Sequence, residues 1–411
     1  MPPDPTSATR PRPGIWRDGR WIVLVMLAAQ LAGFFLRSPR LDYVQIAHRW
    51  GVLAIQPEFS DLYFIAGAGA TYRAGGDPYK ANTFDPLGRA YNYPPLWLHL
   101  SWHRTVSPDF IRMLALAMGV FGTVAFLAFL GPISGRRGLL LGVLACSPPV
   151  ILAAQRANAD ILMVGLVALG LVLLRRGRRA LGYAAFVAAT WLKLYPLFAL
   201  AVLLREPRER LRRVALIVIT AAALCFVAYA GYLGRIFGNT PEGGLHSYGA
   251  RVLAFWFAFF SPAYGWNVDR VLLGRVCSLL AVVVGLLAWR VARRSASLPP
   301  EANSSSQLDG FRAGAAVYVS TFLLSVSFDY RLLFLLLTVP WLASLAASRT
   351  ADRRWGIAAL VLVFGTMWTN GLFWKPLLLT KEASSWGLFF VLTVLLLRTL
   401  PGEWKARLRL A

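Results

Sequence analysis

The chain has 411 residues, of which 57% are hydrophobic and only 15% are charged. So large an apolar fraction exceeds what the core of a soluble protein can bury, and it occurs in runs long enough to cross a bilayer, which excludes the soluble classes. The 43 Lys and Arg residues outnumber the 19 Asp and Glu residues, but they lie mainly between apolar runs, where they set membrane topology, so nucleic acid is not an expected partner.

In chain order, the apolar runs predict an all-α polytopic membrane protein with about ten full transmembrane helices. A disordered cytoplasmic tail (residues 1–20) precedes a single membrane domain (21–400), and a second cytoplasmic tail (401–411) follows it. Basic clusters alternate with connections that carry less charge, which places the basic loops and both termini in the cytoplasm. The predicted spans are 21–37, 110–131, 139–154, 160–174, 212–233, 270–290, 312–327, 330–347, 356–374 and 384–400.

The apolar segment 180–204 does not fit this alternation, because basic clusters flank both of its ends. In its middle, Lys193-Leu194-Tyr195-Pro196 interrupts the helical pattern, since proline removes a backbone donor and disfavours helix at the preceding residue. We therefore expect two half-helices that enter the membrane and return to the cytoplasmic side. A single full span would put one basic cluster on the outer side.

Two connections are too long to be simple turns, and both are predicted outside the cytoplasm: about 38–109 and about 234–269. Their short apolar stretches, Val52–Ile55 and Val252–Phe260, predict interfacial or re-entrant helices. The polar segment at about 291–311, with its run of serines, predicts a disordered cytoplasmic linker. Long loops in compact proteins usually carry function, so we expect the site in the outer connections.

Familiar cofactor motifs are missing from this sequence. It has no phosphate-binding loop, no dinucleotide-binding glycine pattern and no Asp-x-Asp pair, and neither the three cysteines nor the four histidines have the spacing of metal ligands. We therefore expect no cofactor and no metal ion.

The first outer connection holds the most informative carboxylate, Asp61, at the start of a short segment rich in Ala and Gly. Asp61, or Ser60 before it, is well placed to cap a helix there. The same position keeps the carboxylate ionised, because a helix N-terminus favours negative charge. An ionised carboxylate at the membrane surface can also accept a proton from a hydroxyl group, so both interpretations stay open.

Four motifs together resemble glycosyltransferase family 87, whose members are polytopic GT-C-type enzymes. They are the run from Asp61 to Tyr79, the segment Tyr91-Asn92-Tyr93-Pro94-Pro95, the segment Gln155-Arg156-Ala157-Asn158-Ala159-Asp160, and Lys193-Leu194-Tyr195-Pro196. The matches cover roughly the first half of the chain. The second half is similar only in its pattern of spans.

This resemblance implies a transferase that moves a hexose, most often mannose, from a polyprenyl-phosphate donor to a hydroxyl of a lipid or glycan acceptor. It also implies a bacterial-type plasma membrane with the site facing the extracytoplasmic side, and membrane lipids as partners. By position, Asp61 matches the family's essential aspartate, and Asp42 and Asp77 are its competitors in the same connection. A polyprenyl phosphate is already a good leaving group, so one general base suffices and the product has inverted configuration.

The charge that develops on the departing phosphate requires a cation or oriented donors. Lys193 is the leading candidate, because a lysine at membrane depth is costly and usually functional. Arg156 and Arg331, at outer ends of spans, could add further contacts to the phosphate. Each has an ordinary alternative: Lys193 could snorkel or pair with a helix carbonyl, and Arg156 could be an interfacial anchor.

Further residues near the outer ends of the spans are candidates for substrate binding. Tyr91 and Tyr93 could stack on a sugar or be ordinary interfacial aromatics, and Asp329 could simply pair with an arginine. The full set of these candidates is Tyr91, Tyr93, Asn158, Asp160, Tyr195, His246 and Asp329. The main alternative function is a multi-span transporter or lipid flippase, since broken helices also form transporter sites. No repeat between the halves supports that alternative.

Overall fold

The computed structural model describes residues 18–36, 43–100, 106–241, 244, 246–295, 298, 306–324, 326–369 and 375–400. The predicted tails therefore lie outside the described residues, apart from 18–20, as do residues 296–297 and 299–305 of the predicted linker. Within the described ranges almost every regular element is a helix, and the one sheet is a pair of two-residue strands. The expectation of an all-α membrane protein is confirmed at this level.

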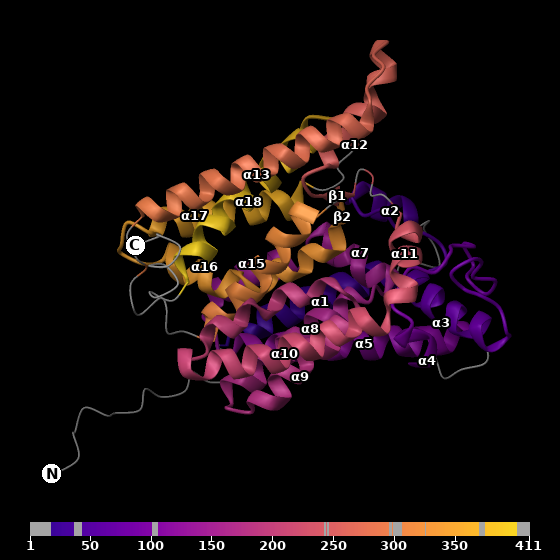
Figure 1. Cartoon of the computed structure of the whole chain (residues 1–411), viewed down its shortest axis with the longest axis horizontal. Helices are drawn as coiled ribbons and strands as arrows, with labels where there is room; N and C mark the ends of the chain where they lie inside the picture. Colours follow the sequence, from indigo (N-terminus) through magenta and orange to yellow (C-terminus); the bar gives the residue numbers. More distant parts are fainter. Residues whose placement is uncertain are drawn as a thin grey trace.

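The first half of the chain forms a series of helices, most of them joined by short turns, with longer loops over residues 50–59 and 74–95 (Figure 1). In order, the elements are α1 (Arg20–Leu36), α2 (Tyr43–Arg49), α3 (Ser60–Arg73), α4 (Leu96–Leu100), α5 (Pro108–Leu130), α6 (Gly135–Ala145), α7 (Pro148–Arg156), α8 (Asp160–Arg175), α9 (Arg179–Leu192), η2 (Tyr195–Arg205), α10 (Arg208–Ala228) and α11 (Ala230–Asn239). The labels η denote 3₁₀ helices.

The second half contains the strand pair and three long helices. Its elements are β1 (Ser247–Tyr248), α12 (Val252–Phe260), η3 (Ser261–Tyr264), α13 (Arg270–Arg294), α15 (Ser306–Leu324), β2 (Ser327–Phe328), η4 (Asp329–Leu337), α16 (Val339–Ala346), α17 (Arg353–Trp368) and α18 (Lys375–Arg398). The strands pair antiparallel, with Ser247 opposite Phe328 and Tyr248 opposite Ser327. This pairing brings the second outer connection against the start of η4.

Four helices among the described residues are long and apolar enough to cross a membrane, and the number rises to six if each bent pair counts as one span. The four are α5, α10, α13 and most of α18, and the bent pairs are α6 with α7 and η4 with α16. The remaining predicted spans correspond to α1, α8, α15 and α17. Because α1, α8 and α17 have only 17, 16 and 16 residues, ten full spans are not confirmed.

The segment 180–204 folds into two short arms, α9 and η2, with Lys193 between them. Each arm is about 21–22 Å long at the usual rise per residue, which is shorter than a bilayer core of about 30 Å. The arms return to their starting side, because the Tyr183 hydroxyl on α9 donates to Oε1 of Glu206, just after η2, at 2.8 Å. The helical hairpin predicted from the basic flanks and the proline is the observed shape.

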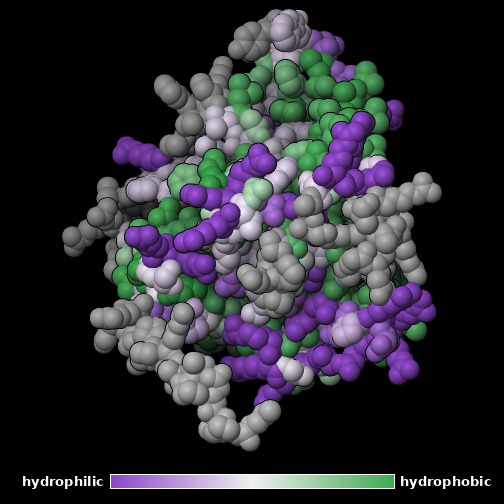
Figure 2. Space-filling view, turned by 90° about the vertical axis from the view of Figure 1, so that its left-hand side faces the viewer, coloured by the Kyte–Doolittle hydropathy of each residue, from purple (hydrophilic) through white to green (hydrophobic). Residues whose placement is uncertain are grey.

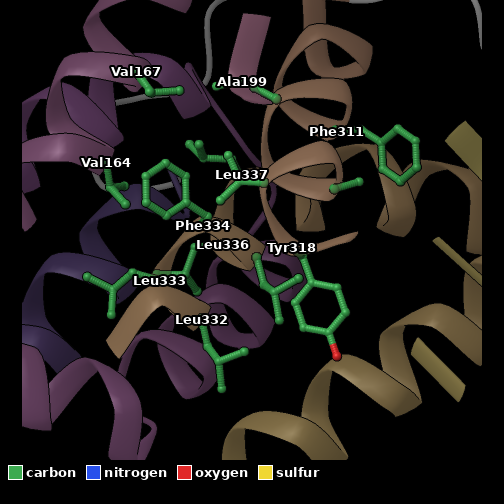
Figure 3. Packing of buried hydrophobic residues seen from close by; sticks show 14 of the residues in the cluster. Val164, Val167, Ala199, Phe311, Tyr318, Leu332, Leu333, Phe334, Leu336 and Leu337 are labelled. Atoms are coloured by element: carbon green, nitrogen blue, oxygen red, sulfur yellow. The ribbon is translucent and has the colours of Figure 1, made fainter. Parts of the chain in front are cut away.

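The main hydrophobic core lies where this hairpin meets α8, α15 and η4 (Figure 3). Val164 and Val167 of α8 and Ala199 of η2 face Phe334 and neighbouring leucines of η4, all of them buried. Helix α8 packs between α5 and α9, and α7 packs on η4. These contacts fix the ends of α7, α8, α9 and η4 relative to one another, and those ends carry most of the polar residues described below.

The structure differs from three expectations drawn from the sequence. Helix α15 begins at Ser306, so the last residues of the predicted linker are helical, and Asp309 pairs with Arg205 at 3.0 Å. Residues 52–55 have no regular secondary structure and so do not form an interfacial helix, although Val252–Phe260 is helical as predicted. Asp18, assigned to the tail, is buried and accepts from the backbone N–H of Ile133 at 3.3 Å.

Candidate active site

Asp61 occupies the first turn of α3, at the end of the molecule where α3 and α4 lie in Figure 1. The N-cap position is Phe59, in a left-handed conformation, and no side chain caps the helix. Capping therefore does not explain why a carboxylate stands here. The side chain of Asp61 turns instead toward α7 and the loop after α3, and only 4% of the residue is exposed.

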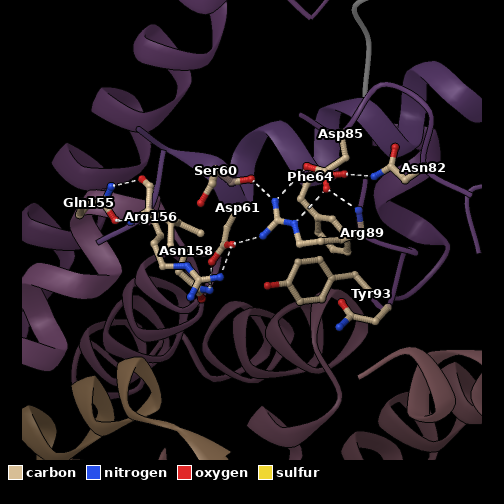
Figure 4. A network of polar contacts seen from close by, with 12 residues as sticks. Ser60, Asp61, Phe64, Asn82, Asp85, Arg89, Tyr93, Gln155, Arg156 and Asn158 are labelled. Atoms are coloured by element: carbon tan, nitrogen blue, oxygen red, sulfur yellow. Dashed lines mark hydrogen bonds and ion pairs between the residues drawn. The ribbon is translucent and has the colours of Figure 1, made fainter. Parts of the chain in front are cut away.

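Three side chains donate to the Asp61 carboxylate (Figure 4). Its Oδ1 accepts from Nη1 of Arg89 at 3.0 Å and from Nη2 of Arg156 at 2.9 Å. Its Oδ2 accepts from Nδ2 of Asn158 at 2.6 Å. Since a carboxylate offers about four acceptor sites, about one remains for another ligand.

Arg89 reaches Asp61 because the loop after α3 packs tightly on that helix. A Cβ on Gly67 would lie 2.7 Å from the carbonyl carbon of Phe84, so only glycine allows this approach. Asn82 strengthens the contact by donating to the carbonyl of Phe64 at 2.9 Å. The loop then presents Asp85 and Arg89, which form a two-point ion pair through Nε at 2.9 Å and Nη2 at 3.0 Å.

The turn between α7 and α8 supplies the other two donors. Ala157 adopts a left-handed conformation at the end of α7, which brings the neighbouring Arg156 and Asn158 to the same carboxylate. Gln155 holds the chain before α3 by donating to the carbonyl of Ile55 at 2.7 Å. The Asn158 side chain also accepts from the backbone N–H of Asp160 at 2.9 Å, which ties the Asp61 site to the start of α8.

Lys193, at the tip of the hairpin, extends this network. Its ammonium group pairs closely with Asp160 and lies 3.3 Å from the hydroxyl of Tyr93 and 3.4 Å from Oδ1 of Asn158. The rings of Tyr93, Tyr195 and Tyr330 surround the ammonium group at 4.8, 5.7 and 5.4 Å. The position is buried, so ion pairing and ring faces replace water around the charge.

Arg331 also lies against Tyr195, with its guanidinium 4.7 Å from the ring centre. It donates to the Ser327 hydroxyl at 2.9 Å, and it makes no ion pair with a carboxylate in the part of the chain that the structure describes. Its Nε is buried without a hydrogen-bond partner there. Arg331 therefore keeps donor capacity that Lys193 has already used.

A second buried ion pair lies beside the strand pair. Lys381 of α18 donates to Oδ2 of Asp329 at 2.8 Å and to the carbonyl of Ser247 at 2.9 Å, and both charged side chains are fully buried. The backbone N–H of Asp329 donates to the carbonyl of His246 at 3.1 Å. The predicted residues Asp329 and His246 thus belong to this second cluster rather than to the Asp61 network.

Together, the charged and hydrogen-bonding groups around Asp61 lower its pKa by more than its burial raises it. Burial alone would raise the pKa of Asp61, but the guanidinium groups of Arg156 and Arg89 and the hydrogen bonds from Arg156 and Asn158 hold it below its usual range. Burial raises the pKa of Tyr93, and the nearby carboxylates add to the effect. Burial, together with the charge of Lys381, lowers the pKa of His246 to about 3, so this imidazole is neutral near pH 7.

Most of the predicted site residues converge on one cluster. The connected set contains Asp61, Tyr93, Arg156, Asn158, Asp160, Lys193, Tyr195 and Arg331. Tyr91 packs against this cluster rather than joining its polar contacts: its ring is fully buried with its centre 6.1 Å from that of Tyr93, and its hydroxyl donates to the carbonyl of Pro94 at 3.3 Å, which favours a packing role.

Sequence reasoning missed two charged residues, Arg89 and Lys381. Arg89 could have been noticed as a basic residue four positions after Asp85 in an outer loop that otherwise reads as irregular. Lys381 begins a Lys-Glu pair just before a predicted span, which the chosen span boundary of 384 placed outside the membrane. No group of three or more His, Cys, Asp or Glu side chains suited to a metal ion occurs among the described residues.

Comparison with known proteins gives one match. The sequence model of glycosyltransferase family 87 matches residues 91–306, slightly more than half of the chain. No curated protein and no solved structure matches. The matched segment contains Arg156, Asn158 and Lys193, whereas Asp61 precedes it and Arg331 follows it. The structure brings these outlying residues to the matched ones.

Proposed function

Because the chain belongs to glycosyltransferase family 87 and is a glycosyltransferase, we propose that it transfers a hexose, with mannose the first choice, from a polyprenyl-phosphate donor to an acceptor hydroxyl. The acceptor is a lipid or glycan, and the reaction takes place at the extracytoplasmic face of a bacterial-type plasma membrane. The observation that supports this most is that Asp61 pairs with two cationic side chains, Arg89 and Arg156, where the first outer connection meets the end of α7 (Figure 4).

In the proposed reaction, the acceptor oxygen attacks the anomeric carbon while the bond from that carbon to the phosphate oxygen breaks. The departing phosphate keeps the electron pair, and the acceptor proton passes to a carboxylate oxygen of Asp61. Attack opposite the phosphate inverts the anomeric configuration. The step needs no general acid, because the phosphate leaves as an anion.

Arg331 and Arg156 are the proposed ligands of the donor phosphate. Each has a guanidinium Nε that is buried without a hydrogen-bond partner among the described residues, so each can donate to phosphate oxygens at little cost to existing contacts. Lys193 contributes positive potential from behind them, although its pairing with Asp160 leaves it fewer free donors. Among the tyrosines around Lys193, Tyr93 is only partly buried, so its ring is the one on which a sugar can stack.

Asp61→Asn tests the base assignment. The asparagine keeps the shape of the side chain but cannot take a proton, so we expect transfer from a radiolabelled polyprenyl-phosphate hexose into a lipid extract to fall about 100-fold or more. The matched control is Asp77→Asn in the same outer connection, because Asp77 pairs with Arg235 and makes no contact with the Asp61 network.

The control should transfer at close to the wild-type rate. If purified Asp61→Asn protein also does so, Asp61 is not the base. Running the assay separately with mannose-linked and glucose-linked donors identifies the sugar, and failure of the wild-type protein with every polyprenyl-phosphate hexose would exclude this donor class.

A further inference from the structure

The two arginines that share Oδ1 of Asp61 are held in very different ways. All three guanidinium nitrogens of Arg89 donate hydrogen bonds. Nε and Nη2 donate to Asp85, Nη1 donates to Asp61, and Nη2 also donates to the carbonyl of Ser60 at 2.5 Å. Its backbone N–H also donates to Asp85, at 2.9 Å, and the guanidinium lies 4.7 Å from the ring centre of Phe64. Such a side chain has little freedom to move.

Arg156 is held much more loosely. Its only hydrogen bond to a side chain among the described residues is the one from Nη2 to Asp61, and its Nε is buried without a partner. The nearest ring is that of Tyr330, whose centre is 5.8 Å from the guanidinium. This arginine can turn toward a new anion without breaking a two-point ion pair.

We infer that Arg89 is a positioning residue for Asp61, and that Asp85 acts through Arg89 by fixing the orientation of its guanidinium. This role rests on the proposed function of Asp61 as the base. Arg89 aims the carboxylate and keeps it ionised, whereas Arg156 is the arginine that turns to the donor phosphate. Asp85 is fully buried at its side chain and pairs with Arg89, so its charge is used within the protein.

The titratable groups that face Asp61 come from three parts of the chain. Arg89 and Tyr93 belong to the outer connection, Arg156 ends α7, and Tyr330 belongs to η4. The two arginines are the cations among them, and each favours the ionised carboxylate. Removing either one raises the pKa of Asp61, because the ionised carboxylate then loses an opposite charge beside it.

The sign of the pH effect follows from the role of a base. A base acts only when it is deprotonated, so activity falls as pH drops through its pKa. When Arg89→Gln raises that pKa, the acid limb of the rate profile moves to higher pH. A purely structural role for Arg89 would lower the rate at every pH without moving the limb.

The test compares Arg89→Gln, Arg156→Gln and Asp85→Asn with Arg235→Gln as the matched control, because Arg235 pairs with Asp77 outside this network. Infrared difference spectra of purified protein follow protonation of Asp61 as pH falls, with Asp61→Asn as the reference. Steady-state rates give the acid limb and the donor KM. This pairing of readouts separates the inference from the proposed function, because the spectra require no transfer activity.

We expect Asp61 to protonate about one pH unit or more higher in Arg89→Gln and in Arg156→Gln, and at the wild-type pH in Arg235→Gln. The donor KM should rise about tenfold or more in Arg156→Gln and stay within about twofold in Arg89→Gln, since a hydrogen bond to a charged group contributes about 1.5–3 kcal/mol. Asp85→Asn should shift Asp61 in the same direction, and adding it to Arg89→Gln should change nothing further.

Two results would overturn the inference: unchanged Asp61 protonation in Arg89→Gln, or a donor KM that rises as much as in Arg156→Gln. If Arg89→Gln does not fold, Arg89→Lys and Asp85→Asn decide the question. Lysine keeps the positive charge but cannot bind Asp85 and Asp61 with the geometry of a guanidinium group. Protonation of Asp61 should therefore stay near the wild-type pH while the maximal rate falls. The two proposals can also fail separately. If the wild-type protein transfers no sugar but Asp61 still protonates at higher pH in Arg89→Gln, the proposed function is wrong and the effect of Arg89 on Asp61 stands.

Discussion

At the scale of single residues, the sequence made Lys193 the leading phosphate ligand, but the structure leaves more free donor capacity on Arg331. Lys193 is buried and already paired with Asp160, whereas Arg331 is half-buried and makes no carboxylate pair in the described chain. A buried ion pair contributes little net stability, but removing one partner leaves an unpaired buried charge. Depth in the membrane predicted that Lys193 matters. It could not distinguish a phosphate ligand from the partner of a carboxylate.

Lys193→Met should therefore affect folding as well as donor use. We expect it to lower the stability of the purified protein by about 3–5 kcal/mol, because Asp160 is left buried and charged. The double variant Lys193→Met/Asp160→Asn should recover much of that loss. Thermal unfolding in detergent measures both effects. If the single variant unfolds at the wild-type temperature and only its donor KM rises, Lys193 is a phosphate ligand and its pairing with Asp160 is secondary.

At the scale of elements, the α9–η2 hairpin shows what a sequence can specify locally. Pro196 and the basic flanks of 180–204 depend on a few adjacent residues, and they predicted a broken, returning segment. The partners of Asp61 could not be found this way, because Arg89 lies 28 residues away and Arg156 lies 95 residues away. The loop around Gly67 and the left-handed turn at Ala157 bring them together, and neither has a sequence pattern that identifies its partner.

Labelling of introduced cysteines tests the hairpin. Arg178→Cys and Arg208→Cys lie beyond the two ends of the hairpin, at exposed positions, and are placed in a background in which Cys146, Cys225 and Cys277 are replaced by alanine. Because the two ends meet near Glu206, an impermeant thiol reagent should reach both cysteines from the same side of the membrane. Modification of one from inside and the other from outside would show that the segment crosses.

At the scale of the whole molecule, the site and the basic loops lie at different ends. Helices α3 and α4 are at the right of Figure 1, whereas α17, which starts with the exposed residues Arg353 and Arg354, is at the left. Figure 2 looks onto that left side and shows hydrophilic side chains across much of it. The alternation of basic and less charged connections along the sequence predicted that the site and the basic loops lie at opposite ends. The number of full spans was not predictable in the same way, because hydropathy does not reveal the bends of 58° and 55° within α6–α7 and η4–α16.

The separation predicts opposite accessibility for the two ends. Lys80, in the first outer connection, and Arg136, at the start of α6, are both exposed. In intact cells, with the native cysteines replaced, an impermeant thiol reagent should modify Lys80→Cys and spare Arg136→Cys, because basic loops stay in the cytoplasm. Lysed cells provide the control, since both cysteines should then react. The reverse pattern in intact cells would place Asp61 on the cytoplasmic side, where a polyprenyl-phosphate sugar presented at the outer face cannot reach it.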